Sequence, residues 1–144
     1  MRLVVVCVGK IRAPFADDVA HYERLIARHA RIETIELPES DPRREGEAIL
    51  SRIGSDGHLC ALDRSGRQVS SEAFAASLEE WRTAGRDVWF AIGGPFGLSP
   101  AVLERAADRI SLGAITLPHL LARVVFLEQL FRAHKIVLGQ RYHY

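Results

Sequence analysis

Two stretches in the C-terminal half of the chain combine an apolar run with residues suited to a tight backbone loop. They are residues 91–97, with the letters AIGGPFG, and residues 112–119, with the letters LGAITLPH. Glycine lets a backbone approach a ligand closely. Small residues and free backbone groups suit a flat ring such as adenine, which needs amide partners and apolar walls. In an open α/β sheet, such loops follow the carboxyl ends of strands. The two stretches therefore predict one pocket lined largely by backbone.

Each stretch also has a simpler interpretation as a strand-to-helix turn that holds no ligand. The glycine run does not have the spacing of the G-x-G-x-x-G dinucleotide fingerprint, and no G-K-[ST] follows it as in a P-loop. The common nucleotide-binding motifs are therefore not what this run represents.

His119 and Arg123 lie four residues apart at the start of a predicted helix and share one of its faces. A histidine beside the pocket suits a general base, and an arginine suits a phosphate contact. The alternatives are a capping or packing role for His119, and for Arg123 a solvated side chain or an ion pair with Glu128 or Glu104.

The C-terminal residues 140–144, QRYHY, are aromatic and basic. Solvated tails are usually featureless and polar, so we expect this one to pack or to stack on a base. Disorder without a role is the alternative.

Composition restricts the class of protein. The chain has 144 residues, 48% hydrophobic and 26% charged, which suits one soluble domain over residues 1–144. A net charge of +1 requires any nucleic-acid partner to be held by a local patch or a composite surface. Cys7 and Cys60 lie in apolar runs and are expected to be buried, reduced thiols, which favours the cytoplasm. No signal peptide, membrane span or metal-ligand spacing is apparent, and His21, His29, His58 and His134 are interpreted as surface or structural residues.

The elements expected to position these residues alternate along the chain. Strands are expected over residues 2–8, 31–37, 58–63, 88–92 and 111–117, with turns over 38–42 and 64–67. Helices are expected over residues 14–30, 43–53, from a cap at Ser70 or Ser71 to Gly85, from Ser99-Pro100, and over 119–137. This alternation predicts an α/β fold with a parallel sheet covered on both faces.

Apolar residues spread over most of the circumference of the last predicted helix. A helix that packs only on its own sheet needs a single apolar stripe. We therefore infer that this helix also packs against a second copy in a two-fold homodimer. A helix enclosed within one chain is the alternative.

The whole chain resembles the RlmH-type SPOUT methyltransferases. The likeness rests on IGGPFGLS at residues 92–99, SLGAITLPHLLARVVFLEQLFRA at 111–133 and the terminal YH. It extends to VGK at 8–10, YERL at 22–25, EGEAIL at 45–50 and LDRSGRQVSSEAFA at 62–75. The tail departs from the usual pattern, with Arg141 where proline is common and Tyr144 where a basic residue is common.

The resemblance implies a compact fold with a C-terminal trefoil knot and a homodimer. It implies S-adenosylmethionine as cofactor and methylation of N3 of a pseudouridine in 23S ribosomal RNA on the assembled ribosome. It implies no metal and no membrane partner. By the same resemblance the catalytic residues are His119, Arg123, Tyr142 and His143, and the cofactor contacts are Leu62, Gly93, Leu112, Gly113, Ala114, Ile115, Thr116 and Leu117.

Two other classes of function are considered. One is a ribosome-associated protein that holds a nucleotide without turnover. The other is a small nucleotide hydrolase, for which the chain lacks the expected carboxylate or P-loop.

Overall fold

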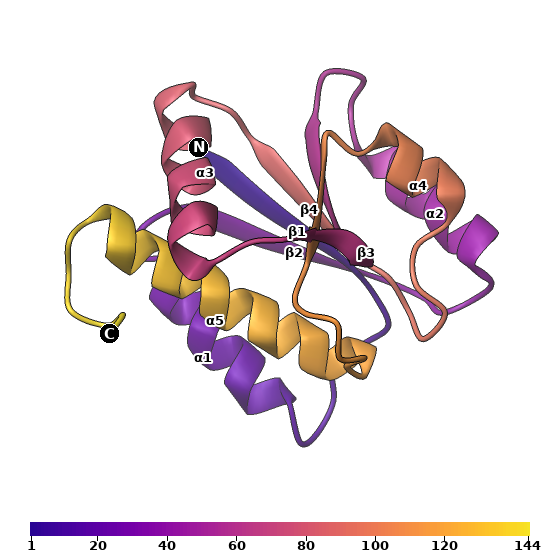
Figure 1. Cartoon of the computed structure of the whole chain (residues 1–144). Helices are drawn as coiled ribbons and strands as arrows, with labels where there is room; N and C mark the ends of the chain where they lie inside the picture. Colours follow the sequence, from indigo (N-terminus) through magenta and orange to yellow (C-terminus); the bar gives the residue numbers. More distant parts are fainter.

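The computed structural model describes residues 1–144 and contains five strands alternating with five helices (Figure 1). The strands are β1 (Arg2–Val8), β2 (Arg31–Leu37), β3 (His58–Gln68), β4 (Val88–Ile92) and β5 (Asp108–Ser111). The helices are α1 (Ala16–Ile26), α2 (Pro42–Arg52), α3 (Ser71–Thr83), α4 (Pro100–Arg105) and α5 (His119–Val137). No helix combines the length and the apolar character that a membrane crossing requires.

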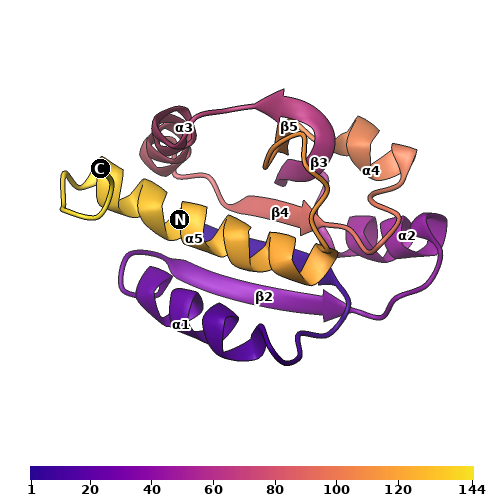
Figure 2. The ribbon, with the colours of Figure 1, turned by 60° about the horizontal axis from the view of Figure 1, so that its bottom comes forward.

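The strands form one sheet in the order β2-β1-β4-β3-β5, and every neighbouring pair is parallel. Helices α1, α3 and α5 cover one face, and α2 and α4 cover the other (Figures 1 and 2). The predicted α/β class is therefore confirmed. Because all strands point the same way, the loops that follow β1, β3, β4 and β5 meet at one edge of the sheet. The trefoil knot stays a prediction.

The sheet separates two apolar cores, which explains why β1 is apolar throughout. Alternate side chains of a strand point to opposite faces. Leu3, Val5 and Cys7 enter the core beneath α1, α3 and α5, and Val4, Val6 and Val8 enter the core beneath α2 and α4.

Local capping signals predicted two helix starts correctly. The Ser70 side chain accepts from the Ala73 amide at the start of α3, and Ser99 accepts from Val102 at the start of α4. Pro100 occupies the first turn of α4, as its fixed φ favours. Helix α1 is shorter than the expected 14–30, because residues 27–29 already form turns.

The predicted turn over 64–67 is wrong, since β3 continues to Gln68. Leu62 and Arg67 both pair with Ile110 of β5, so the four residues between them bulge out of the ladder. A Cβ on Gly66 would lie 2.8 Å from the carbonyl carbon of Arg109. This glycine therefore marks a close approach of two backbones.

The fifth strand was predicted over 111–117, but β5 ends at Ser111. The Ser111 hydroxyl accepts from the amide of Gly113 at 3.1 Å and donates to its carbonyl at 2.9 Å. These contacts replace sheet pairing, and Gly113 has a φ of +135°. Residues 112–118 consequently form a loop.

Helix α5 lies between α1 and α3 over the sheet, as Figure 2 shows. Its buried apolar residues are Leu120, Phe126, Leu127, Leu130, Phe131 and Ala133. Packing inside one chain thus accounts for most of the apolar surface from which a dimer was inferred. Leu121, Val124 and Val125 are only half-buried, and the homodimer stays a prediction.

Candidate functional site

A pocket of about 410 Å³ lies at the carboxyl-terminal edge of the sheet, where the loops after β3, β4 and β5 meet. This volume is in the range of small-molecule sites. The walls are residues 62–65, 92–98, 112–113 and 115–117, with His119 and Ala122 from α5. The two stretches singled out in the sequence therefore line one cavity.

The wall after β4 is a tight turn that depends on glycine. The amide of Gly97 donates to the carbonyl of Gly94 at 3.0 Å, and Gly97 has a φ of +80°. A Cβ on Gly93 would lie 2.6 Å from the carbonyl carbon of Gly97. This turn therefore brings the backbone of Gly93, Gly94 and Gly97 to the pocket, beside the side chains of Pro95 and Phe96.

The wall after β5 is joined to the β3 bulge by a hydrogen bond from Arg64 to the hydroxyl of Thr116. Ile115 on this wall is 81% exposed, and Phe96 on the glycine turn is 83% exposed. Ala114 is exposed and does not line the pocket, so its predicted cofactor contact stays a prediction. Arg64 was not predicted, because residues 64–67 were interpreted as a plain turn.

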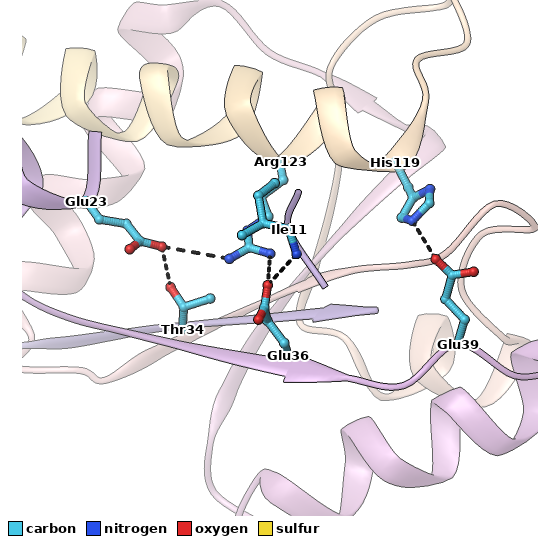
Figure 3. Close-up of polar contacts among 7 residues, drawn as sticks. All are labelled: Ile11, Glu23, Thr34, Glu36, Glu39, His119 and Arg123. Atoms are coloured by element: carbon cyan, nitrogen blue, oxygen red, sulfur yellow. Dashed lines mark hydrogen bonds and ion pairs between the residues drawn. The ribbon is translucent and has the colours of Figure 1, made fainter. Parts of the chain in front are cut away.

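His119 lines the pocket at the first residue of α5, and its Nε2 lies 3.1 Å from Oε1 of Glu39 (Figure 3). The side chain of His119 is 14% exposed. An ionised carboxylate only accepts hydrogen bonds, so Nε2 carries the proton and a neutral ring has its lone pair on Nδ1. A Cβ on Gly9 would lie 3.0 Å from Nε2 of His119 and 3.0 Å from Oε1 of Glu39. His119 is thus oriented by a carboxylate, as a general base requires.

Arg123 does not line the pocket. Its side chain is 4% exposed, with Nη1 at 2.7 Å from Oε2 of Glu36 and Nη2 at 3.9 Å from Oε1 of Glu23. Burial raises the pKa of Glu36, but the hydrogen bonds from Arg123 and from the Ile11 amide outweigh it, and the net shift is downward. Arg123 is therefore ion-paired, although with partners other than the Glu128 and Glu104 that the sequence suggested. This arrangement does not support a direct substrate contact in one chain.

Within the tail, Tyr142 and His143 pack against their own chain, whereas Tyr144 is fully exposed. The Tyr142 ring contacts Phe131 edge-on at 4.8 Å, and the Arg132 guanidinium lies 4.8 Å from the Tyr142 ring centre. His143 contacts Oε1 of Glu72 at 2.6 Å through Nε2, and Arg132 at 3.1 Å through Nδ1. Burial and nearby carboxylate charge raise the pKa of Tyr142.

Arg132 is the centre of this tail cluster, and the sequence reasoning missed it. Its Nε lies 3.0 Å from Oε1 of Glu128, one helical turn earlier. The i, i+4 spacing of the two residues was the available signal. Tyr142 and His143 pack against Phe131 and Arg132, which lie about 18–20 Å along α5 from His119 at a rise of 1.5 Å per residue. In one chain, therefore, the tail and the pocket do not meet.

Cys7, Cys60 and His58 have structural roles. Burial raises the pKa of both Cys7 and Cys60 to about 12, so these thiols are not nucleophiles at neutral pH. His58 pairs with Asp108 at 2.9 Å, tying β3 to β5. No group of three or more His, Cys, Asp or Glu side chains is placed to hold a metal ion.

Comparisons with known proteins agree with this geometry. The "Predicted SPOUT methyltransferase" family model matches residues 1–143. The chain is 48% identical to "Ribosomal RNA large subunit methyltransferase H" of Rubrobacter xylanophilus, covering 99% of this chain and 98% of the relative. Relatives of the same name from Listeria monocytogenes and an Anaeromyxobacter species are each 40% identical, over 99% of both chains.

The solved structure of the A. aeolicus TrmH/SpoU tRNA modifying enzyme has the same fold. It superposes with a TM-score of 0.50 at 13% identity and covers 96% of this chain and 77% of that one. At such low identity the likeness concerns the fold alone. The family match over nearly the whole length, together with the identities to full-length relatives, shows that the chain belongs to the SPOUT methyltransferase family.

Proposed function

We propose that this protein transfers a methyl group from S-adenosylmethionine to N3 of a pseudouridine in 23S ribosomal RNA on the assembled ribosome. The observation that carries the proposal is the single pocket formed by three loops in a chain whose relatives are named ribosomal RNA large subunit methyltransferase H. The near-neutral charge of the chain supports a composite site, in which the ribosome provides much of the binding surface. The proposed location is the cytoplasm.

The pocket has the chemistry that an adenosyl group requires. The backbone of Gly93 and Gly113, which lines the pocket, offers amide and carbonyl partners to an adenine ring, and Leu62, Leu112 and Leu117 offer apolar walls. Ile115 and Thr116 complete the side formed by residues 112–117. When bound, the cofactor supplies an electrophilic methyl group on its sulfonium sulfur.

His119 is the proposed general base. The imide nitrogen of the base must lose its proton to become nucleophilic, and the Nδ1 lone pair left by the Glu39 contact is a suitable acceptor. General-base assistance is worth about 10²–10⁴ in rate. His119→Asn is therefore expected to lower methylation by about that factor while S-adenosylhomocysteine still binds.

Tyr142 and His143 are proposed to act from the second subunit of a homodimer. Within one chain they are held against Phe131 and Arg132, away from His119, so a part in the reaction requires a partner's pocket. The half-buried Leu121, Val124 and Val125 are the apolar surface available for that contact.

The direct test is to incubate the protein with ribosomes and methyl-labelled S-adenosylmethionine, and to locate the label in the RNA by mass spectrometry. Label on N3 of one pseudouridine is the expected result. Binding of S-adenosylhomocysteine without any transfer of label would instead indicate a nucleotide-binding protein with no methyltransferase activity.

The contribution of the second subunit is tested by mixing two inactive variants, His119→Asn and His143→Ala. If each site combines the pocket of one chain with the tail of the other, a heterodimer has one intact site. Random reassortment makes about half of the dimers heterodimers, and one of the two sites in each is intact. The mixture therefore regains about a quarter of the wild-type activity. If both residues act within one chain, every site carries a defect and the mixture stays inactive.

A further inference from the structure

The first two turns of α5 are attached to the end of β2 by two carboxylates, as Figure 3 shows. Glu39, just after β2, contacts His119, and Glu36, within β2, contacts Arg123. His119 and Arg123 lie one turn apart on the same face of α5. Both contacts therefore fix the helix start relative to the sheet.

The Arg123 contact joins more of the molecule than the His119 contact. Glu36 accepts from Arg123 at 2.7 Å and from the amide of Ile11, in the loop after β1, at 2.8 Å. Glu23 of α1 lies 3.9 Å from Arg123 and accepts from the hydroxyl of Thr34 at 2.9 Å. One guanidinium thus connects α5 with α1, β2 and the loop after β1.

The burial of Arg123 indicates that it acts inside the protein. Its side chain is 4% exposed, whereas those of Glu23 and Glu36 are each 32% exposed. Its Nε is buried without any hydrogen-bond partner. A guanidinium used to bind a phosphate would have to leave both carboxylates and expose two negative charges beside the site.

The position of Arg123 connects this network to the pocket. Ala122, the preceding residue, lines the pocket, as do His119 and Leu117 at the start of the helix. A shift of the first turns of α5 would move the loop of residues 112–118 that precedes them. Small displacements at a reacting centre are costly, since about 1 Å can reduce the rate 10²-fold.

We propose that Arg123 is a positioning residue that holds the start of α5, and with it His119 and the loop of residues 112–118, by means of Glu36. This inference rests on the proposed methyl transfer for its consequence in catalysis. It assigns Arg123 no contact with RNA or cofactor.

The test compares Arg123→Met, Glu36→Gln and the double variant. In Arg123→Met, two carboxylates lose the cation that they share, and we expect the Kd for S-adenosylhomocysteine to rise about ten-fold and the methylation rate to fall about 10²-fold. In the double variant the amide oxygen introduced by Glu36→Gln still accepts from Ile11, and no charge is left unpaired at that position. Replacing both members of an ion pair is often tolerated where removing one is not, so we expect affinity and rate to recover to within about three-fold of wild type.

A matched control separates positioning from general destabilisation. Arg105 donates to the carbonyls of Gly54 and Gly57, in the loop before β3. Arg105→Met is expected to lower the thermal unfolding temperature while the Kd for S-adenosylhomocysteine stays at the wild-type value. Binding is measured by calorimetry well below the unfolding temperature of every variant.

Hydrogen exchange tests the same proposal without any ligand. Arg123→Met is expected to accelerate amide exchange at residues 112–122 about ten-fold, leaving residues 93–97 unchanged, and the double variant is expected to restore protection. If wild-type protein fails to bind S-adenosylhomocysteine, the proposed function is wrong, and the exchange result still decides the positioning role. The proposal would be overturned if Arg123→Met lost methylation activity while its amide exchange and its affinity for S-adenosylhomocysteine stayed unchanged, and if Glu36→Gln did not restore the activity. That result would indicate a direct contact between Arg123 and the substrate.

Discussion

Replacement of Gly93 by alanine is the sharpest test of the pocket, because the structure specifies what the added methyl group meets. Its Cβ would lie 2.6 Å from the carbonyl carbon of Gly97, 2.8 Å from that residue's oxygen and 3.0 Å from the amide nitrogen of Leu98. All three are backbone atoms and cannot rotate away. Ordinary van der Waals contact begins at 3.4 Å, so the turn must open by about 0.8 Å.

The magnitude of the effect follows from this displacement. Inserting a methyl group into a tightly packed position costs about 1–3 kcal/mol. If the free protein relieves the strain by opening the turn, a ligand that requires the closed turn must restore it. At about 1.4 kcal/mol for each factor of ten, the Kd for S-adenosylhomocysteine should rise about 5- to 150-fold.

The assay is isothermal calorimetry with S-adenosylhomocysteine, accompanied by thermal unfolding. Gly139→Ala is the matched control, because Gly139 lies at the far end of α5, has a φ of +64°, and an added Cβ there would meet no atom within 4 Å. It introduces backbone strain of about 1–2 kcal/mol without any contact with the pocket. A Kd for Gly93→Ala within two-fold of wild type, or an equal loss in Gly139→Ala, would refute the reasoning.

Three further predictions follow from other groups. Burial lowers the pKa of His134 to about 4, below the value of about 6.5 in an unfolded chain. The unfolded state therefore takes up the proton first, and roughly 3 kcal/mol of folding stability should be lost as pH falls from 6.5 to 4. Urea unfolding of wild type and His134→Leu at pH 7 and pH 4.5 measures this loss. An equal loss of stability on acidification in the two proteins would contradict the prediction. Cys7 and Cys60, with pKa values raised to about 12, should resist a thiol reagent in the native protein and both react in denaturant, so rapid native labelling would count against their burial. Arg64→Ala removes the exposed contact with Thr116 and should raise the Kd for S-adenosylhomocysteine about two- to five-fold. Calorimetry can distinguish this increase from an unchanged Kd.

Local sequence information was sufficient for the elements of the fold. Residues 2–8 and 88–92 are apolar because the strands they form are covered on both faces, and their bounds agree with the structure. Ser70 and Ser99 mark helix starts because a cap bonds to amides only three residues away. Gly93 similarly indicated a tight backbone turn, since the backbone atoms that an added Cβ would meet there, in Gly97 and Leu98, lie within five residues.

Tertiary structure decided what depends on contacts between distant residues. The polar start of β5 at Asp108 is paired with His58 of a neighbouring strand, and no periodicity in residues 108–111 indicates a strand. The bulge in β3 likewise depends on the register of Leu62 and Arg67 against Ile110.

Within the candidate site, the place of His119 depends on neighbours in sequence, whereas the places of Arg123 and His143 depend on contacts between distant residues. Sequence predicted His119 beside the pocket, because the loop and the helix start are consecutive. Arg123 and Glu36 lie 87 positions apart, so only the packing of α5 over the sheet shows that the arginine is buried in an ion pair. The contacts of His143 with Arg132 and Glu72, which hold it outside the pocket of its own chain, likewise join residues that are distant in sequence or belong to different elements. A chain segment encodes its own conformation through neighbours, whereas the partner of a buried charge is determined by how the segments pack.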